Sequence, residues 1–412
     1  MLAELTGVDP ALLNDSAALR SALTDALITA GAHVRQVVAE KFAPQGVTVL
    51  ALLAESHASV HTWPEHGIAH LDVFTCGDEA DPVRAVDLIA AALGAADVHR
   101  EVVERGAGPR AVVEPLATGM TRRWELGAVH HAARTRYQQV LIADTAHGLT
   151  LFCDNERQSS EATQLVYHEA LFVPAAALAA RLDRVLVIGS SEGVVSQLAV
   201  DAGATLVDHV DIDADCVRAC AEHLPYGYTP EELAAAERHQ GPVRVYYADG
   251  AEFVERCDQR YDMVVVDLPD ERPTEPDAQL NRLYTAPFLQ RCAALLTDGG
   301  VVVSQAGSPA MWRDDSLRTA WRRFHDVFAQ VVPYTSDEHE WAFLLGRSTA
   351  GPDPVDEMLT RLPRLAIRPT SIDADSLRTR TVPSFRLRNQ APLDHDGTVQ
   401  PVPPAEKSSI TI

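Results

Sequence analysis

The stretch LLAESHASVHTWPE, at residues 52–65, gathers groups that can take part in covalent catalysis. Ser56 follows Glu55 at the end of an apolar run, and His61 comes five residues later. Cys76 ends the next apolar segment. If a tight return joins the two segments, a hydroxyl, an imidazole and a thiol share one pocket, as nucleophilic catalysis requires. Spacing alone also allows polar residues in an ordinary turn and a buried cysteine.

The apolar segments around this stretch predict the elements that hold it. Residues 11–31 have leucines and alanines at helical spacing, and residues 46–56 form the apolar, β-branched run of a buried strand. Residues 68–77 alternate as the next strand, and residues 81–95 are predicted to form a helix that begins at an Asp-Pro pair. This order predicts an α+β two-layer sandwich for residues 1–112.

A second set of candidate residues follows apolar strands in the other half of the chain. The strand VLVIG leads into the turn GSSEG, and the segments VDID, ADG and VVVDLPD each end a further strand. Apolar strands that alternate with helices predict a parallel, doubly wound sheet, whose carboxyl ends line one crevice. We expect a nucleoside site there, with Asp211 or Asp213 for ribose hydroxyls and Asp249 for an adenine amino group. Solvated turn acids are the alternative.

Changes of pattern set the other expected boundaries. A linker is expected at residues 113–122, a small antiparallel β domain at 123–175 and the doubly wound α/β domain at 176–350. The strands of the small domain are expected in YQQVLIAD, GLTLFCDN and RQSSEATQLVY. Residues 351–412, rich in Pro, Arg, Ser, Thr and Asp, are expected to form a partly disordered arm.

Composition limits the classes of function. The 412 residues suit two or three domains, and a formal net charge of −23 disfavours nucleic acid or an anionic membrane as the main partner. No apolar run predicts a membrane span, and the acidic N-terminus is unlike a signal peptide. The six cysteines include no CxxC pair, which fits a reducing compartment and no metal site. We therefore expect a cytoplasmic protein without a metal.

The motif FAPQGVTV…LLAESHASVHTWPEHGIAHLDVFTCG resembles the bacterial and archaeal S-adenosylmethionine decarboxylases, a pyruvoyl-enzyme family. The resemblance covers roughly residues 2–107 and implies that the chain cuts itself between Glu55 and Ser56. The serine hydroxyl attacks the preceding carbonyl, an N→O acyl shift forms an ester, and β-elimination leaves a pyruvoyl group in place of Ser56. By the same resemblance, His61 assists processing and Cys76 is the catalytic proton donor. No pyridoxal phosphate is then expected.

The family pattern also assigns residues around the substrate. Phe42 matches the residue that stacks on adenine, Glu65 matches a substrate-contacting acid, and Thr48 matches a hydroxyl residue that helps self-cleavage. A pyruvoyl carbonyl suits decarboxylation, because an α-amino acid needs an electron sink that forms a Schiff base with its amine. A thiol is a fair donor of the proton that the carbanion then takes up. A pyruvoyl decarboxylase of ornithine or arginine remains the alternative.

The motifs of the other half resemble the spermidine synthases, which are polyamine aminopropyltransferases, over about residues 119–347. The resemblance implies a Rossmann-like, methyltransferase-type fold and a site for decarboxylated S-adenosylmethionine. The residues at substrate-contacting positions of the matching motifs are Gln138, Tyr167, His168, Glu192, Asp211, Asp213, Asp249 and Asp270. Three segments depart from the family: the turn GSSEG, the pair Thr163-Gln164 and the loop YTSDEHEW at residues 334–341.

Aminopropyl transfer displaces a sulfonium by a neutral amine, so a carboxylate must accept the proton of the amine. Asp267 is the expected base, and Asp270 is expected to hold the far ammonium of the acceptor. Glu192 is expected to pair with the donor's ammonium and to disfavour undecarboxylated S-adenosylmethionine. Putrescine is the default acceptor, with agmatine, cadaverine or a longer polyamine left open. A nucleoside-binding module without transfer activity is the second alternative.

The two resemblances together predict a bifunctional polyamine-synthesis enzyme. One half would make decarboxylated S-adenosylmethionine and the other half would consume it. The expected partners are therefore S-adenosylmethionine, its decarboxylated form and a diamine. A homo-oligomer is also expected, because members of both families usually assemble.

Overall fold

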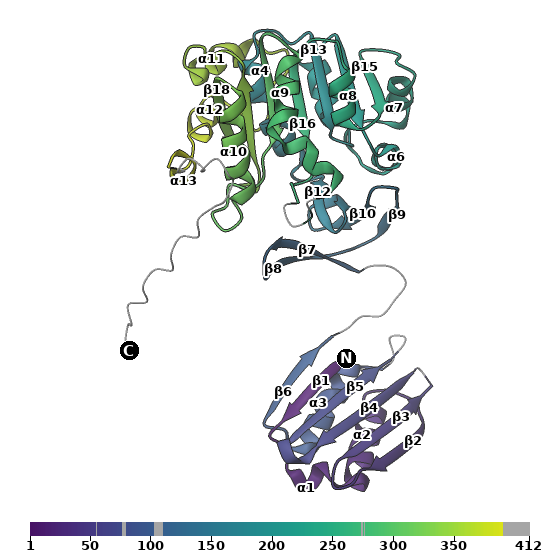
Figure 1. Ribbon diagram of the computed structural model, residues 1–412. Coiled ribbons are helices and arrows are strands. Elements are labelled where there is room, and N and C mark those ends of the chain that lie inside the picture. Colours follow the sequence, from purple (N-terminus) through teal and green to yellow (C-terminus); the bar gives the residue numbers. More distant parts are fainter. Residues whose placement is uncertain (55, 76–79, 103–109, 273–274, 276, 390–412) are drawn as a thin grey trace, which may run out of the picture. The chain divides into compact units, whose positions relative to one another are not determined.

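The computed structural model describes residues 1–54, 56–75, 80–102, 110–272, 275 and 277–389. The chain folds as two compact units, Met1–Gly108 and Pro109–Ile412 (Figure 1). Within the described residues, no helix has both the length and the apolar character that crossing a bilayer requires.

The first unit is built on a six-stranded antiparallel sheet with the order β2-β3-β4-β5-β1-β6. Its strands are β1 (Leu2–Thr6), β2 (Val34–Lys41), β3 (Val47–Leu53), β4 (His57–Trp63), β5 (Ile68–Phe74) and β6 (Asp97–Glu101). The short helices α1 (Pro10–Leu13) and η1 (Pro64–His66) lie between strands in the sequence. The sequence pattern predicted β3 and β5, whereas β1, β2, β4 and β6 were not predicted; β4 occupies residues that were expected to form a turn.

Two longer helices, α2 (Ser16–Thr29) and α3 (Pro82–Leu93), pack against each other and against the sheet. Each begins where an aspartate accepts hydrogen bonds from first-turn backbone N–H groups, Asp15 in α2 and Asp81 in α3. The strands bury alternate residues, so one face of the sheet and the two helices enclose a single apolar core. The first unit is thus a sheet-rich α+β fold.

The second unit begins with a β-hairpin, β7 (Ala111–Ala117) and β8 (Met120–Glu125). A four-stranded antiparallel sheet follows, made of β9 (Val129–Arg134), β10 (Gln139–Thr145), β11 (Gly148–Cys153) and β12 (Glu156–Ser160). The residues predicted as a linker, 113–122, therefore lie in a hairpin, where the indole N–H of Trp124 donates to buried Glu114 at 2.7 Å. The segment RQSSEATQLVY is a strand only as far as Ser160, because a helix begins at Gln164.

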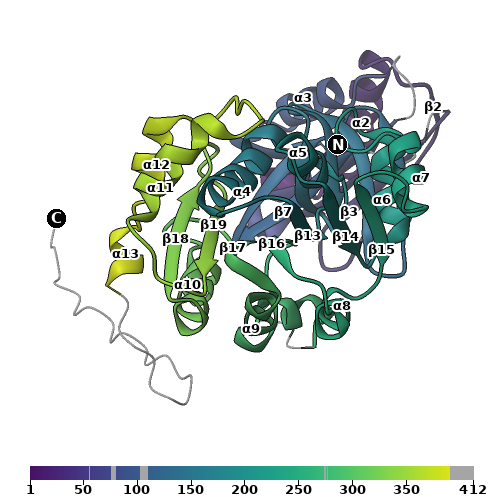
Figure 2. The same ribbon diagram turned by 90° about the horizontal axis from the view of Figure 1, so that it is seen from above.

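A seven-stranded sheet with the order β15-β14-β13-β16-β17-β19-β18 forms the larger part of this unit (Figure 2). Five strands are parallel: β13 (Arg184–Gly189), β14 (Leu206–Asp211), β15 (Val243–Tyr247), β16 (Tyr261–Asp267) and β17 (Leu296–Gln305). At one edge, β19 (Ala342–Arg347) pairs antiparallel with β17, and β18 (Gln330–Thr335) pairs antiparallel with β19.

Helices cover both faces of this sheet, as the alternation of apolar strands and helices predicted. Along β13, Val185 and Val187 belong to one core, and Leu186 and Ile188 belong to the other. The first core includes α4 (Gln164–Leu178), α5 (Val194–Asp201), α11 (Pro354–Arg361) and α12 (Ala374–Arg380). The second includes α8 (Gly250–Arg256), α9 (Ala286–Ala294), α10 (Asp315–Val327) and α13 (Phe385–Arg388). The remaining helices are α6 (Ala214–His223), α7 (Pro230–Glu237), η2 (Gln279–Tyr284) and η3 (Leu362–Arg364).

The described part of the predicted arm packs against the second unit. Met358 and Leu377 are fully buried in the core that contains α4. The carboxylate of Glu169, in α4 and only 3% exposed, accepts hydrogen bonds of 2.6–3.2 Å from the backbone N–H and hydroxyl groups of Thr370 and Ser371. Residues 390–412, the rest of the predicted arm, lie outside the described residues.

We expect Glu169→Gln to lower the free energy of unfolding of the second unit by about 3 kcal/mol, because an amide turns an N–H₂ group toward buried donors. Denaturant titration followed by circular dichroism measures this change. Glu161→Gln is the matched control, since Glu161 is exposed, and we expect it to cost about 0.5 kcal/mol or less. Equal losses for the two variants would show that Glu169 does not anchor residues 370–371.

Candidate functional sites

The first candidate site surrounds the turn between β3 and β4. The pairing of these strands runs from Thr48 opposite His61 to Leu52 opposite His57, and the N–H of Leu53 donates to the carbonyl of Ser56 at 3.0 Å. Ser56 therefore lies in a tight hairpin turn and is half-buried.

The imidazole nearest to Ser56 is that of its neighbour in the sequence. The Ser56 Oγ lies 3.2 Å from Nδ1 of His57, and Nε2 of His57 lies 3.9 Å from a carboxylate oxygen of Asp72. A hydroxyl, an imidazole and a carboxylate thus follow one another, an arrangement that can take a proton from the serine. His57 was not among the predicted residues, although it directly follows Ser56 in the sequence.

His61, one of the residues predicted to join Ser56, is not brought to it within this chain. His61 Nδ1 lies 2.9 Å from Thr48 Oγ1, and the strand register places His61 four residues along β4 from His57. At about 3.3 Å per residue, this spacing is roughly 13 Å. Glu55 and Cys76 lie outside the described residues. The structure therefore shows the Thr48–His61 contact and places the His61 imidazole away from Ser56.

The two predicted substrate-contacting residues of this unit lie at the opposite end of the hairpin. Phe42, which is 50% exposed, begins the turn between β2 and β3, and its N–H donates to Gly46. Glu65 follows β4 and accepts a hydrogen bond of 3.0 Å from the side-chain amide of Gln45. A full strand length therefore separates Phe42 and Glu65 from Ser56.

The second candidate site is a cavity of about 570 Å³ in the second unit. It opens at the carboxyl ends of β13, β14 and β16, with β12 and the end of β7 completing the wall. The cavity is lined by all nine residues that the sequence predicted for this half: Gln138, Tyr167, His168, Glu192, Asp211, Asp213, Asp249, Asp267 and Asp270.

Two aspartates at the end of β14 form one side of the cavity. Asp211 accepts hydrogen bonds of 2.8 Å from the N–H of Asp213 and from the hydroxyl of Ser191. Asp213 accepts from Thr135 Oγ1 at 2.7 Å and from Gln138 Nε2 at 3.0 Å. Burial raises the pKa of Asp211 to about 7, although these hydrogen bonds oppose the shift.

Other residues shape this side of the cavity. At Gly189, where φ is +80°, a Cβ would overlap the carbonyl of Asp267, so only glycine allows the strand ends to approach so closely. Asp249 caps α8, and its other oxygen accepts from Gln279 at 2.7 Å and from Arg282 at 2.5 Å. Glu192 is buried, which raises its pKa, and nearby His168 opposes that rise.

The Tyr167 hydroxyl donates to Oδ1 of Asp267 at 2.6 Å. Burial raises the pKa of Tyr167 well above its usual range, so the phenol remains a donor. The rings of Trp341 and Phe343 pack edge-on against Tyr167 at 5.7 and 5.1 Å and hold it in place. No hydrogen bond within the described residues occupies Oδ2 of Asp267, so this oxygen can accept a proton from a bound amine.

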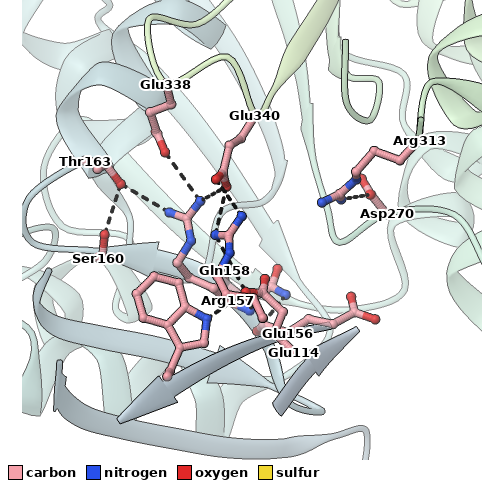
Figure 3. A network of polar contacts seen from close by, with 12 residues as sticks. Glu114, Glu156, Arg157, Gln158, Ser160, Thr163, Asp270, Arg313, Glu338 and Glu340 are labelled. Carbon is pink, nitrogen blue, oxygen red and sulfur yellow. Dashed lines mark hydrogen bonds and ion pairs between the residues drawn. The ribbon is translucent and has the colours of Figure 1, made fainter. Parts of the chain in front are cut away.

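Arginines that were not among the predicted residues form ion pairs at and beside the cavity; Figure 3 shows Arg157 and Arg313 with their partners. The guanidinium of Arg157, 3% exposed, contacts Glu340 at 2.6 Å and Glu338 at 3.4 Å, and Arg122 also contacts Glu340 at 2.6 Å. Burial acts to raise the pKa of Glu340, but the two arginines outweigh it and hold the pKa below its usual value. Two arginines, Arg157 of β12 and Arg122 of β8, therefore hold the loop YTSDEHEW, which differs from the family pattern.

Within the residues that the structure covers, no cluster of three or more His, Cys, Asp or Glu side chains is placed to hold a metal ion.

Two protein families match separate parts of the chain. Residues 1–106 match the family described as S-adenosylmethionine decarboxylase, and residues 164–337 match the spermine/spermidine synthase domain. The chain is 44% identical over 115 residues, 28% of its length, to S-adenosylmethionine decarboxylase proenzyme 2 of Halalkalibacterium halodurans, and the match covers 91% of that protein. It is 32% identical over 266 residues, 61% of its length, to polyamine aminopropyltransferase 2 of Hyperthermus butylicus, with 82% of that protein covered.

The chain belongs to both families. It is a fusion of an S-adenosylmethionine decarboxylase unit and a polyamine aminopropyltransferase unit. The solved structure of a spermidine synthase in complex with the transition-state analogue AdoDATO is similar with a TM-score of 0.59, at 17% identity, and the match covers 69% of this chain and 95% of that one. This likeness confirms the predicted α/β fold of the aminopropyltransferase unit.

Proposed function

We propose that the decarboxylase unit cleaves itself between Glu55 and Ser56 and then decarboxylates S-adenosylmethionine, and that the aminopropyltransferase unit uses the product. The second reaction transfers the aminopropyl group to putrescine or a related amine and yields spermidine and methylthioadenosine. The observation that carries the transfer reaction is the Tyr167–Asp267 hydrogen bond at the floor of a cavity lined by strand-end acids.

Residues around the β3–β4 turn fit the formation of a pyruvoyl group. Ser56 lies in a tight turn, and the imidazole of His57 at 3.2 Å can remove the proton of its hydroxyl. When present, the pyruvoyl group supplies the electron sink for decarboxylation. His61, with Thr48 at 2.9 Å, remains our proposal for a processing residue, and Cys76 for the proton donor.

A second copy of the chain offers a way to complete this site. Ser56 lies at one end of the β3–β4 hairpin, and Phe42 and Glu65 lie at the other end. If two copies pack with their hairpins antiparallel, the substrate-contacting residues of one copy approach the Ser56 of the other. This arrangement agrees with the homo-oligomer that we expect for the fusion.

The aminopropyltransferase unit holds the donor and accepts the proton. Asp211 and Asp213 receive the ribose hydroxyls, while Asp249 and Gln138 contact the base and nucleoside. Glu192 pairs with the ammonium of the donor, beside His168. The free oxygen of Asp267 takes the proton of the attacking amine, and Tyr167 fixes the orientation of its carboxylate through the other oxygen.

Donor binding is expected to weaken as the pH falls below about 7, the value to which burial raises the pKa of Asp211. Ribose hydroxyls donate to the ionised carboxylate, so binding lowers this pKa and releases a proton. Well below pH 7, the Kd of methylthioadenosine rises about tenfold for each pH unit, because the ionised fraction of Asp211 falls about tenfold. This factor corresponds to about 1.4 kcal/mol. Calorimetric titration between pH 6 and 8, without an amine, measures the slope. Asp211→Asn should bind more weakly at pH 8 and lose the slope; an unchanged slope contradicts the assignment.

The complete function is tested by incubating the purified chain with S-adenosylmethionine and a panel of diamines and by reading the products by mass. We expect release of carbon dioxide followed by spermidine and methylthioadenosine when putrescine is present. Release of carbon dioxide from ornithine or arginine, and not from S-adenosylmethionine, would overturn the first reaction. Supplying decarboxylated S-adenosylmethionine directly tests the second reaction on its own.

A further inference from the structure

The carboxylate expected to hold the far ammonium of the acceptor is already bonded on both oxygens. Oδ1 of Asp270 accepts from the side-chain amide of Gln305 at 2.5 Å, and Oδ2 is paired with the guanidinium of Arg313 at 3.2 Å. Both members of the ion pair are largely covered, with 18% of Arg313 and 24% of Asp270 exposed. An incoming ammonium would have to separate this pair, so Asp270 is a poor anchor for a cation.

A different carboxylate in the same cavity is free. Ten carboxylates of the described residues line the cavity, and nine of them accept a hydrogen bond or take part in an ion pair. Those nine are Glu114, Asp154, Glu192, Asp211, Asp213, Asp249, Asp267, Asp270 and Glu275. Among the described residues, the side chain of Glu156 has no hydrogen bond or ion pair.

The surroundings of Glu156 favour the binding of a cation. Glu156 begins β12, opposite Cys153 of β11, and is half-buried in the cavity wall. Burial raises its pKa, while the charges around it have both signs and largely offset each other. A partly desolvated carboxylate without a partner is unfavourable, and a bound ammonium removes that cost.

The neighbouring arginine does not supply this partner. Arg157, the next residue in β12, directs its guanidinium to Glu338, Glu340 and Thr163 (Figure 3). Figure 3 also shows Asp270 and Arg313 as a pair of their own, apart from the Arg157 network. Among the described residues, each arginine that lines the cavity is engaged with another carboxylate: Arg157, Arg272 and Arg313.

We propose that Glu156 binds the distal ammonium of the acceptor amine, and that the Arg313–Asp270 pair closes the alternative position. The substrate class is then a diamine or longer polyamine whose second cation reaches β12. An acceptor with a distal carboxylate is excluded, because Glu156 would repel it. This inference rests on the proposed aminopropyl transfer and assigns the residue that recognises the acceptor.

The test pairs a change in the enzyme with a change in the acceptor. Glu156→Gln and the parent chain are assayed with decarboxylated S-adenosylmethionine and either putrescine or butylamine, which lacks the second ammonium. Glu156→Gln should lower kcat/KM for putrescine about 10- to 100-fold, as expected for a hydrogen bond between charged groups. It should leave kcat/KM for butylamine within about twofold. The reason is that removing the carboxylate from the enzyme and removing the second ammonium from the amine delete the same contact.

Glu275→Gln is the matched control, since Glu275 lines the same cavity but is exposed and paired with Arg272. It should leave kcat/KM for putrescine within about twofold of the parent. An unchanged KM for the donor verifies that each variant is folded.

Three results would overturn the assignment. In the first, Glu156→Gln uses putrescine as well as the parent does while Asp270→Asn does not. In the second, Glu156→Gln loses activity with both amines equally. In the third, the parent chain transfers faster to 4-aminobutanoate than to putrescine. That result would mean that an arginine, and not Glu156, contacts the distal group of the acceptor. A parent chain that transfers to no amine contradicts the proposed function instead, so the two failures are distinguishable.

Discussion

Ser56→Ala is expected to remain a single chain on a denaturing gel and to have no detectable S-adenosylmethionine decarboxylase activity. Alanine has no hydroxyl to attack the carbonyl of Glu55, so neither the cut nor the pyruvoyl group can form. The parent chain should give two bands. The gel must be denaturing, because β3 and β4, on the two sides of the cut, remain paired strands of one sheet.

Aminopropyl transfer provides the internal control for this variant. The two units are separately compact, so Ser56→Ala should transfer the aminopropyl group from added decarboxylated S-adenosylmethionine at the rate of the parent. Ser59→Ala is the matched serine control and should be cut normally, since Ser59 lies within β4 and not at the turn. Cleavage of Ser56→Ala at the same bond would rule out Ser56 as the nucleophile.

Asp267→Asn is expected to lower kcat for aminopropyl transfer about 10²- to 10⁴-fold, the usual contribution of a general base. An amide keeps the size of the side chain and can still accept from Tyr167, but it cannot take the proton of the amine. Steady-state assays with decarboxylated S-adenosylmethionine and putrescine measure this change, and the KM of the donor should stay close to that of the parent.

Two further variants show whether the loss is specific. Tyr167→Phe removes the hydrogen bond that orients Asp267 but leaves the base, so a smaller loss of about tenfold is expected. Decarboxylation by the same Asp267→Asn chain should be unaffected. Transfer by Asp267→Asn at the parent rate would show that another group, or water, accepts the proton.

The aminopropyltransferase site was largely predictable because its acids follow strands. In a parallel sheet the carboxyl ends of the strands lie at one edge, so Asp211 at the end of β14 and Asp267 at the end of β16 both face the crevice, on the two sides of β13. The motif order then added Tyr167 and Gln138. Periodicity and turn chemistry were sufficient for this part of the fold.

Contacts between distant residues were not predictable in the same way. Arg157 and Glu340 are 183 residues apart, and Arg313 reaches Asp270 across 43 residues. No local pattern records such a pair, so the bonded state of Asp270 became visible only in the folded chain. The hairpin β7–β8 was also missed, because its proline and glycine indicate a break in structure as readily as an edge strand.

The decarboxylase site shows a different limit. The spacing from Ser56 to His61 suggested a shared pocket, but strand register decides which residues meet, and it places Thr48 opposite His61. Register depends on where the turn falls, and the turn at residues 53–56 aligns His57 with Ser56 instead. The family resemblance assigned the residue roles here, whereas the hairpin determines which side chains lie next to Ser56 and His61.

The bonds from Glu169 to Thr370 and Ser371 impose an order in time on the fusion. A ribosome must extend the chain past Ser371 before α4, which carries Tyr167, gains its last anchor. The decarboxylase unit, by contrast, has its sixth strand by Glu101. Domains fold as units while the chain emerges, so the first unit can complete its sheet while the second unit is still being made. Each newly made polypeptide therefore holds a folded decarboxylase unit before α4 of the aminopropyltransferase unit has its last hydrogen-bond partners.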